Sequence, residues 1–452
     1  MAKKQLTIEE KLQAALVPAE EQPYKVPENW CWTRLGNVAQ WGSGGTPSRK
    51  NPSFYEGDIP WIKTGELNEE YIYDTEEHIS KEALEKSSAK IFPVNTVVLA
   101  MYGATIGKVG ILGVPATTNQ ACACGVCSKG IKFAFLAKFL QSQKQSFIMK
   151  GKGGAQPNIS QQIIKNHPIA LPPLAEQSRI VARIESLFAK LDEAKEKIQE
   201  VLDGADLRRA AILHQAFTGK LTEKWRKENG VADKWIETSS AKLFEYVTSG
   251  SRGWAQYYSS DGAIFLRMGN LNHGTIDLDL NDIQYVSLPD KTEGQRSRVK
   301  KGDILISITA DVGMVACIKT DMEEAYINQH VALARPVEEV YSEFIAWYFV
   351  SDVGLKQLQN MQRGATKVGL TLKDIKSVKL KMPQIEEQQE IVRLLDNLLS
   401  REQSTVTACE EALTTIDTLK KSILARAFRG ELGTNDPSDP SAKELLREIL
   451  SA

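Results

Sequence analysis

The 452 residues of the chain suffice for two to four domains, and a composition of 42% hydrophobic and 25% charged residues is that of a globular protein. The formal net charge of −1 gives no general attraction to nucleic acid, so any basic surface must be local or completed by a partner subunit. No apolar run reaches the length of a membrane span, and the N-terminus lacks the apolar stretch of a signal peptide. We therefore expect a cytoplasmic protein.

A short amphipathic helix is predicted near each end of the chain. Thr7 with Glu10, and Ser441 with Glu444, have the spacing of a capping box, in which two side chains satisfy the first backbone amides of a helix. Prolines follow the first helix, and the turn-rich sequence NDPSDP precedes the second. We assign to these two helices, with their linkers, residues 1–24 and 433–452.

Two long stretches repeat each other and predict two long helices. One begins LPPLAEQSRIVARIESL at Leu171, and the other begins MPQIEEQQEIVRLLDNL at Met382. Apolar residues in the first recur at alternate steps of four and three, which is typical of a coiled-coil seam. Each stretch follows a proline, ends at a glycine (Gly219 or Gly430) and predicts a helix of about 44 residues, or roughly 65 Å.

A helix of that length needs a partner helix. Pairing between two chains would satisfy this need, but the in-register duplication favours an antiparallel coiled coil within one chain. Glu402 interrupts the second seam and is expected to set the register or to face a partner. We assign to the two long helices residues 173–221 and 383–432.

A globular block precedes each long helix, and the two blocks align. IPWIKTGEL in residues 25–172 matches IFLRMGNL in residues 222–382, with Lys63 opposite Arg267. The chain is therefore a tandem duplication of a unit of about 210 residues, too long a period for a solenoid. We predict an α/β fold of the α+β kind for each block.

The stretches between the shared strands diverge. Residues 68–90 and 272–300, named here the divergent segments, share little, as do residues 41–57 and 248–262. Two equivalent scaffolds would then carry two different surfaces, as a protein that reads two different things requires. Neutral drift in loops would give the same picture.

The six cysteines do not form a disulfide framework typical of a secreted protein. Cys122, Cys124 and Cys127 lie close enough in the sequence CACGVC to suggest metal ligation. The repeat places Val331 and Leu333 at matching positions, so a buried strand explains both copies better. We expect no metal site.

The chain resembles the DNA-specificity subunits of type I restriction–modification systems. The resemblance rests on the opening VPENWCWTRLGNVAQWGSGGTPS, on the doubled proline–EQ–helix pattern, and on the endings ILHQAFTGKL and ILARAFRGEL, and it covers nearly the whole chain. It implies that each block is a target recognition domain that reads one half of a bipartite DNA site. It further implies that the helices hold these domains apart and dock two adenine-N6 methyltransferase subunits, and that the full complex adds restriction/translocase subunits. S-adenosylmethionine, ATP and Mg²⁺ would belong to those partners, and no cofactor to this chain.

No catalytic motif is complete in the sequence. NPSF at residues 51–54 has serine where the loop of an adenine methyltransferase has its second proline, and no cofactor-binding pattern accompanies it. GATIGKV at residues 103–109 is one residue short of a P-loop. We expect a non-catalytic subunit. The alternatives are a self-contained DNA methyltransferase, and a coiled-coil scaffold with two ligand-binding blocks unrelated to DNA.

Base reading requires donors and acceptors on loops, with Arg or Lys for guanine and Asn or Gln for adenine, whereas phosphates bind cations, hydroxyls and amides. Lys63 and Arg267 stand out because the repeat retains a cation at one strand position. So do the loops GKGGAQPN and QRGATKVG, which close the two blocks, and Lys150 is a further cation beside the first of them. The candidates for DNA contact in the first block are Ser48, Arg49, Lys50, Lys63, Tyr102, Lys108, Lys152, Gln156 and Asn158. Those in the second block are Arg252, Tyr257, Arg267, Asn270, Arg296, Arg298, Arg363, Thr366 and Lys367.

Overall fold

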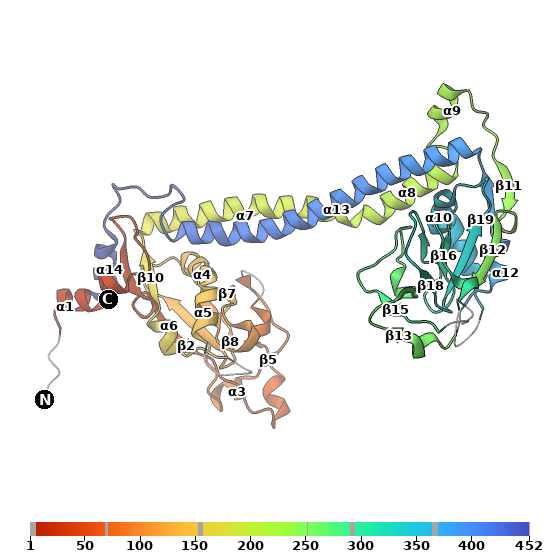
Figure 1. Cartoon of the computed structure of the whole chain (residues 1–452). Helices are drawn as coiled ribbons and strands as arrows, with labels where there is room; N and C mark the ends of the chain where they lie inside the picture. Colours follow the sequence, from red (N-terminus) through yellow and green to blue (C-terminus); the bar gives the residue numbers. More distant parts are fainter. Residues whose placement is uncertain are drawn as a thin grey trace. The chain divides into compact units, whose positions relative to one another are not determined.

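The computed structural model describes residues 6–67, 71–151, 157–250, 252–289, 294–363 and 369–451. The chain divides into two compact units, Met1–Lys197 with Ala412–Ala452 (unit 1) and Ile198–Glu411 (unit 2) (Figure 1). Each unit holds one globular block, the start of the long helix that follows it, and the end of the other long helix. The predicted helical segments 173–221 and 383–432 therefore each contribute to both units.

Unit 1 is built on a five-stranded sheet and a three-stranded sheet. The five-stranded sheet, antiparallel apart from its β4–β7 edge, has the order β2 (Ala39–Ser43), β9 (Cys122–Cys127), β6 (Val97–Ala100), β7 (Val109–Leu112) and β4 (Tyr71–Ile72). The smaller sheet has the order β5 (His78–Ile79), β3 (Ile59–Ile62) and β8 (Thr117–Thr118), with β3 and β8 parallel. A separate antiparallel pair joins β1 (Cys31–Arg34) to β10 (Pro168–Leu171).

Unit 2 repeats the core of this topology with a four-stranded main sheet and a four-stranded second sheet. Its main sheet has the order β12 (Phe244–Ser249), β19 (Val331–Pro336), β16 (Ile304–Ser307) and β17 (Val315–Cys317). Its second sheet has the order β13 (Tyr258–Ser259), β15 (Gln284–Val286), β14 (Ala263–Leu266) and β18 (Ala325–Ile327), and β14 and β18 are parallel. The separate pair is β11 (Ile236–Ser239) with β20 (Lys379–Met382). The predicted duplication of an α+β block is thus confirmed.

The cysteine cluster forms strand β9, as the buried-strand interpretation predicted. Cys122 and Cys124 are fully buried among apolar neighbours, and burial raises the pKa of the Cys124 thiol to about 12. Burial also raises the pKa of Cys127 to about 12. Neutral thiols of this kind behave as small apolar side chains.

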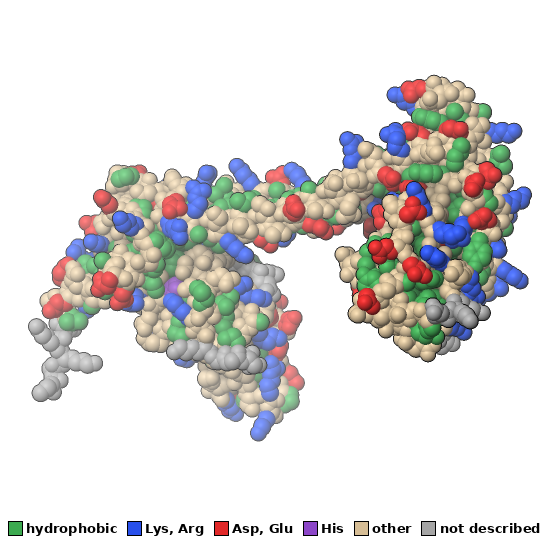
Figure 2. Space-filling view, in the orientation of Figure 1, with side chains coloured by type: hydrophobic (Ala, Val, Ile, Leu, Met, Phe, Trp, Pro, Cys, Tyr) green, Lys and Arg blue, Asp and Glu red, His purple; other side chains and the backbone are tan. Residues whose placement is uncertain are grey.

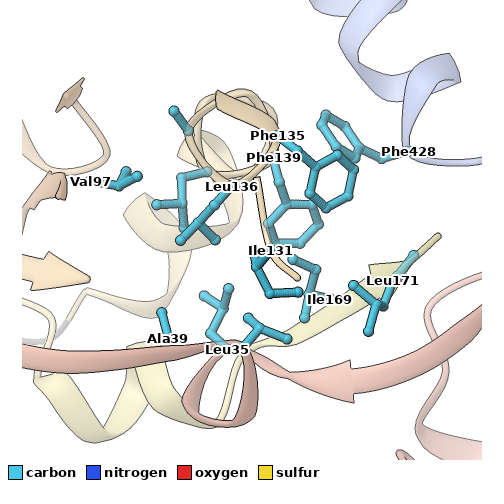
Figure 3. Packing of buried hydrophobic residues seen from close by; sticks show 14 of the residues in the cluster. Leu35, Ala39, Val97, Ile131, Phe135, Leu136, Phe139, Ile169, Leu171 and Phe428 are labelled. Carbon is cyan, nitrogen blue, oxygen red and sulfur yellow. The ribbon is translucent and has the colours of Figure 1, made fainter. Parts of the chain in front are cut away.

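One helix packs against the main sheet of each unit, and the end of a long helix packs against it in turn. In unit 1, α4 (Phe133–Ser142) presents Phe135 and Phe139 to Phe428, with ring centroids 5.5 and 5.2 Å apart (Figure 3). Leu35, Ile169 and Leu171 belong to the same buried cluster.

In unit 2 the corresponding helix is α10 (Ser342–Val350), whose Phe344 and Tyr348 lie 5.4 and 5.3 Å from the ring of Phe217. Phe217 and Phe428 occupy matching positions in the two copies. They therefore have the same packing role in the two units.

The first long helix is present as predicted, with a local irregularity at Gly204, whose amide still donates to the Glu200 carbonyl at 3.2 Å. It comprises α7 (Leu174–Asp203) and α8 (Ala205–Phe217), separated at Gly204, whereas α13 (Ile385–Ala427) is unbroken. Arg208 Nη2 donates to the carbonyl of Val201 at 2.6 Å, and a Cβ on Gly204 would lie 2.6 Å from Arg208 Nη1. Because Gly204 has no side chain, the guanidinium of Arg208 has room to donate to the carbonyl of Val201 in the helix. The predicted glycine ends are confirmed, since Gly219 and Gly430 share a φ of +75°.

The long helices pair antiparallel within each unit (Figure 1). In unit 1, Asp192 of α7 forms an ion pair with Lys420 of α13. In unit 2, Nε and Nη2 of Arg208 donate to Glu402 Oε1 at 3.0 and 2.8 Å. The polar residue that interrupts the second seam therefore forms an ion pair with Arg208, close to Gly204 in the first long helix.

The terminal helices α1 (Ile8–Ala15) and α14 (Ala442–Ser451) pack together in unit 1, and the capping box of Thr7 and Glu10 is present as predicted. The remaining α-helices are short: α2 (Leu35–Val38), α3 (Lys81–Glu85), α5 (Lys144–Lys150), α6 (Gln161–Lys165), α9 (Glu223–Asn229), α11 (Asp352–Asn360) and α12 (Leu372–Ser377).

The glutamate of each EQ pair is a buried acceptor that fastens the unit together. In unit 1, Glu176 Oε2 accepts hydrogen bonds from Trp30 Nε1 (2.7 Å) and from Asn435 Nδ2 (2.8 Å), which follows α13. Thr434 also donates to Glu176, at 3.3 Å. One carboxylate thus holds together residues at the start of the block, at the start of one long helix and after the end of the other.

Unit 2 repeats this arrangement at Glu387. Its Oε1 accepts hydrogen bonds from Thr222 (2.7 Å), from Trp235 Nε1 (3.3 Å) and from Arg226, all of which follow α8. Glu387 and Arg226 form an almost fully buried ion pair.

The glutamine of each EQ pair anchors the helix that covers the sheet. Gln177 Oε1 accepts from the backbone amide of Lys132, the residue before α4, at 2.9 Å. Gln388 Oε1 accepts from the amide of Tyr341, the residue before α10, at 3.0 Å. The doubled signature therefore has a structural role in both units.

Candidate nucleic-acid interface

The paired cations Lys63 and Arg267 occupy the same local turn. Each ends a strand, β3 or β14, and is followed by a single 3-10 turn, Thr64–Glu66 or Met268–Asn270. Glu66 Oε2 accepts the amide of Lys63 at 2.7 Å, and Asn270 Oδ1 accepts the amide of Arg267 at 2.8 Å. The repeat thus places a cation at the same point of each scaffold.

The side-chain amide of Asn270 forms its hydrogen bonds within this turn and the segment that follows it. Its side chain is buried, and Nδ2 donates to the carbonyls of Asp279 (2.8 Å) and Asp282 (3.0 Å). No polar group of Asn270 is left for a base, so the structure assigns it the role of holding the divergent segment rather than that of a reader.

Both repeated cations are paired with carboxylates that come from the divergent segments. Lys63 Nζ lies 2.9 Å from Glu77 Oε1 and 3.2 Å from Glu76 Oε2, and Arg267 Nη2 lies 3.0 Å from Asp282 Oδ2. The hydrogen bond to Glu77 raises the pKa of Lys63, and the same bond lowers the pKa of Glu77. A cation occurs at this position in both copies. The carboxylates that orient it come from segments whose sequences differ between the copies.

Arg49 lies over an aromatic surface in unit 1. Its guanidinium carbon is 4.0 Å from the ring centre of Tyr55 and 5.2 Å from that of Trp61. Both rings are fixed, because Tyr55 OH donates to the carbonyl of Pro47 (2.7 Å) and Trp61 Nε1 to that of Gly45 (2.9 Å). Arg49 Nη2 lies 2.6 Å from Glu77 Oε2, so one carboxylate bridges Arg49 and Lys63.

Unit 2 has an aromatic cluster at the matching place without such a cation. Trp254 stacks on Phe265 at 5.5 Å, and Tyr326 meets Trp254 edge-on at 5.4 Å. Among the residues that the structure describes in this unit, no Lys or Arg lies over these rings. Arg252 is exposed nearby, and the backbone carbonyl of Tyr257 accepts from Ser287. The two blocks therefore differ in the group that they offer at this point.

The base of the closing loop lies at the same site in both units. In unit 1, Tyr102 bridges to Asn158, and the amide of Ile159 donates to the carbonyl of Met101 at 2.9 Å. In unit 2, Thr309 and Arg363 bridge to Gly369, so Arg363 stands at the loop base, with its Nη2 3.5 Å from Asp374. Lys152, Gln156, Thr366 and Lys367, predicted within these loops, lie outside the described residues.

The other candidates lie on exposed turns of their own units. Ser48 and Lys50 flank Arg49, while Arg296 lies within the turn Gln295–Ser297 and Arg298 follows it. Lys108 lies on the half-buried turn before β7. Figure 2 shows Lys and Arg interspersed with Asp and Glu over both blocks on the face in view. Sequence reasoning missed Glu77, Tyr55 and Trp61, because it sought cations and amides and gave no weight to the acids and rings that orient them.

Lys150 is exposed, and its ammonium group contacts the buried ring of His167. Its Nζ lies 2.9 Å from Nδ1 of His167, whose other ring nitrogen lies 3.2 Å from Gln143 Oε1. Burial, with Lys150 as a second cause, lowers the pKa of His167 to about 3. A neutral His167 can then accept a hydrogen bond from the lysine, and burial lowers the pKa of Lys150 as well.

The two motifs that resemble catalytic loops are turns in the fold. NPSF contributes to the 3-10 turn Pro52–Tyr55, with Phe54 buried, and GATIGKV contains the turn Gly103–Thr105 between β6 and β7. Within the described ranges, no three His, Cys, Asp or Glu side chains converge as a metal site. No helix in the described part of the chain has the length and apolar character needed to cross a membrane.

The comparisons with known proteins place this architecture in a family. A model of the type I restriction modification DNA specificity domain matches residues 27–203 and 255–411, which is most of the chain. The chain therefore belongs to the family of type I restriction–modification DNA specificity subunits.

Named relatives agree with this assignment. The chain is 26% identical over 422 residues to the EcoKI specificity subunit of Escherichia coli K12, covering 90% of both proteins. It is 24% identical over 424 residues to the StySPI specificity subunit of Salmonella potsdam, again covering 90% of both.

Two solved structures share the fold. One is the HsdS subunit from Thermoanaerobacter tengcongensis, with a TM-score of 0.63, 21% identity, and coverage of 91% of this chain and 99% of that one. The other comes from work on the assembly and conformational transition of the type I R-M system, with a TM-score of 0.66, 22% identity, and coverage of 90% and 100%.

Proposed function

We propose that this chain is the non-catalytic subunit that gives a type I restriction–modification complex its DNA sequence specificity. Each block would read one half of a bipartite, asymmetric site. One observation carries the proposal: both units hold a cation at the same strand end, Lys63 or Arg267, while the residues that orient it come from segments that differ between the copies.

The need for two readers follows from energetics. A wrong base pair costs about 1–3 kcal/mol, so a half-site of a few base pairs discriminates weakly on its own. Joining two weak readers in one chain makes the second binding event intramolecular and raises the effective concentration. Asymmetry of the site follows because the two readers present different groups.

The catalytic work would fall to partner subunits. The long helices pair through one seam, and exposed residues along α7 and α13 remain free to dock two adenine-N6 methyltransferase subunits. S-adenosylmethionine would bind to those subunits, and ATP and Mg²⁺ to restriction/translocase subunits.

Methylation mapping tests the proposal. We would express the chain with the methyltransferase of its own system in cells without other adenine methylation, and sequence N6-methyladenine across the genome. The expected result is one bipartite motif with unlike halves. A chain in which residues 25–172 are replaced by a second copy of the unit 2 block should methylate two identical, inverted halves. An unchanged motif in that chimera, or no methylation with the natural chain, would contradict the proposal.

A further inference from the structure

The guanidinium of Arg49 is held in place before any ligand arrives. One face stacks on Tyr55 at 4.0 Å, and Nη2 lies 2.6 Å from Glu77 Oε2. Stacking and the ion pair together fix the plane of the guanidinium. The side chain is still 56% exposed. A planar donor fork fixed by stacking loses little entropy when it forms two hydrogen bonds.

The charge around Arg49 argues against a phosphate ligand. Glu77 bridges Arg49 and Lys63, and Glu76 lies 3.2 Å from Lys63, so two cations meet two carboxylates. The hydrogen bond from Lys63 lowers the pKa of Glu77, which keeps its carboxylate charged. A phosphate contact draws its affinity from net positive charge, and this cluster has none. A neutral cluster with an oriented donor fork suits the edge of a base.

Guanine is the base that this fork matches. Its major-groove edge presents two acceptors, O6 and N7, at the spacing of two guanidinium N–H groups. We infer that Arg49 reads a guanine in the half-site bound by the first block, and that Glu77 is a positioning residue for it. This inference rests on the proposed function. The aromatic cluster of unit 2, with Trp254 and Phe265, has no stacked Lys or Arg among its described neighbours, so the same reading is not expected from the second block.

The experiment is methylation mapping with the complete chain and its methyltransferase partner, comparing the natural chain with four variants. Arg49→Lys keeps the charge but loses the planar fork, and Arg49→Ala loses both. Glu77→Gln removes the charge that positions Arg49. The matched control is Arg34→Lys, because Arg34 is also ion-paired to a glutamate, Glu21, in the same unit.

We expect Arg49→Lys and Arg49→Ala to relax one guanine position in one half-site by roughly 10-fold or more, with the other half unchanged. Glu77→Gln should relax the same position to a smaller extent, and Arg34→Lys should leave the motif intact. A phosphate contact would behave differently: lysine would substitute for Arg49, and alanine would lower methylation at all sites equally. Either that pattern or an unaltered motif overturns the inference while the proposed function stands. No methylation with the natural chain would overturn both.

Discussion

Trp30 Nε1 donates a 2.7 Å hydrogen bond to Glu176 Oε2, and both residues are buried although 146 positions separate them. The same pair recurs as Trp235 and Glu387 at 3.3 Å. A carboxylate buried in this way is stable only while its donors remain in place. This hydrogen bond therefore connects the start of each globular block to the start of the long helix that follows the block.

Removing this acceptor should destabilise unit 1. Glu176→Ala leaves the buried indole N–H of Trp30 without an acceptor and removes the hydrogen bond from the half-buried Asn435, and each hydrogen bond to a charged group is worth ~1.5–3 kcal/mol. We expect the free energy of unfolding to fall by about 3 kcal/mol or more, measured by urea denaturation. Glu185→Ala, on an exposed face of α7, should change it by less than about 0.5 kcal/mol. Equal effects of the two substitutions would contradict this role.

The end of the second long helix should stabilise the first block. Phe428 is 1% exposed and packs against Phe135 and Phe139, so Phe428→Ala leaves a cavity that costs about 3–5 kcal/mol. Differential scanning calorimetry should show a lower melting temperature for unit 1. Leu419→Ala is the matched control, because Leu419 is exposed on the same helix. A normal melting temperature for Phe428→Ala would show that α13 is dispensable to the block.

The helix register should depend on Arg208 and Glu402. Arg208→Ala leaves the mostly buried Glu402 carboxylate without its partner, and we expect a lower free energy of unfolding, measured by urea denaturation. The exchanged pair Arg208→Glu with Glu402→Arg should recover part of this loss in a double-mutant cycle. A coupling energy near zero would mean that the seam alone sets the register.

His167 should make unit 1 sensitive to acid. Its pKa is about 3 in the folded chain against an ordinary 6.5, so the unfolded chain binds the proton first. The stabilising contribution is complete above pH 6.5 and is lost as the pH falls toward 3. At pH 5 the loss is about 2 kcal/mol. His167→Gln should flatten the decline in unfolding free energy between pH 7 and pH 5. The same slope in this variant as in the natural chain would assign the acid sensitivity to other groups.

The fold could be predicted from the sequence because its signals are repeated. Heptad spacing, glycine ends and aligned strand cores occur twice, so each copy supports the interpretation of the other. The local irregularity at Gly204 was missed because one glycine in a good helical pattern does not reveal that Arg208 will donate to a helix carbonyl. The structural role of Glu176 and Gln177 was missed because their partners are distant in the chain.

The candidate interface was only partly predictable. Cations are visible in a sequence, but their pairing is not. Lys63 is predicted as a repeated position, yet its neutralisation by Glu76 and Glu77 arises from the folding of a segment whose sequence differs between the two copies. Asn270 looked like a reader of adenine because amides can be readers, and only its burial shows that it serves the turn.

The buried EQ pairs have a consequence for how such a gene can change. Glu176, Gln177 and their counterparts Glu387 and Gln388 contact partners outside the divergent segments, and the sequences around them are similar. Similar stretches on both sides of a variable one are sites where homologous recombination can exchange the intervening DNA. A new recognition specificity could then arise in one genetic event, without change to the EQ residues that hold each unit together.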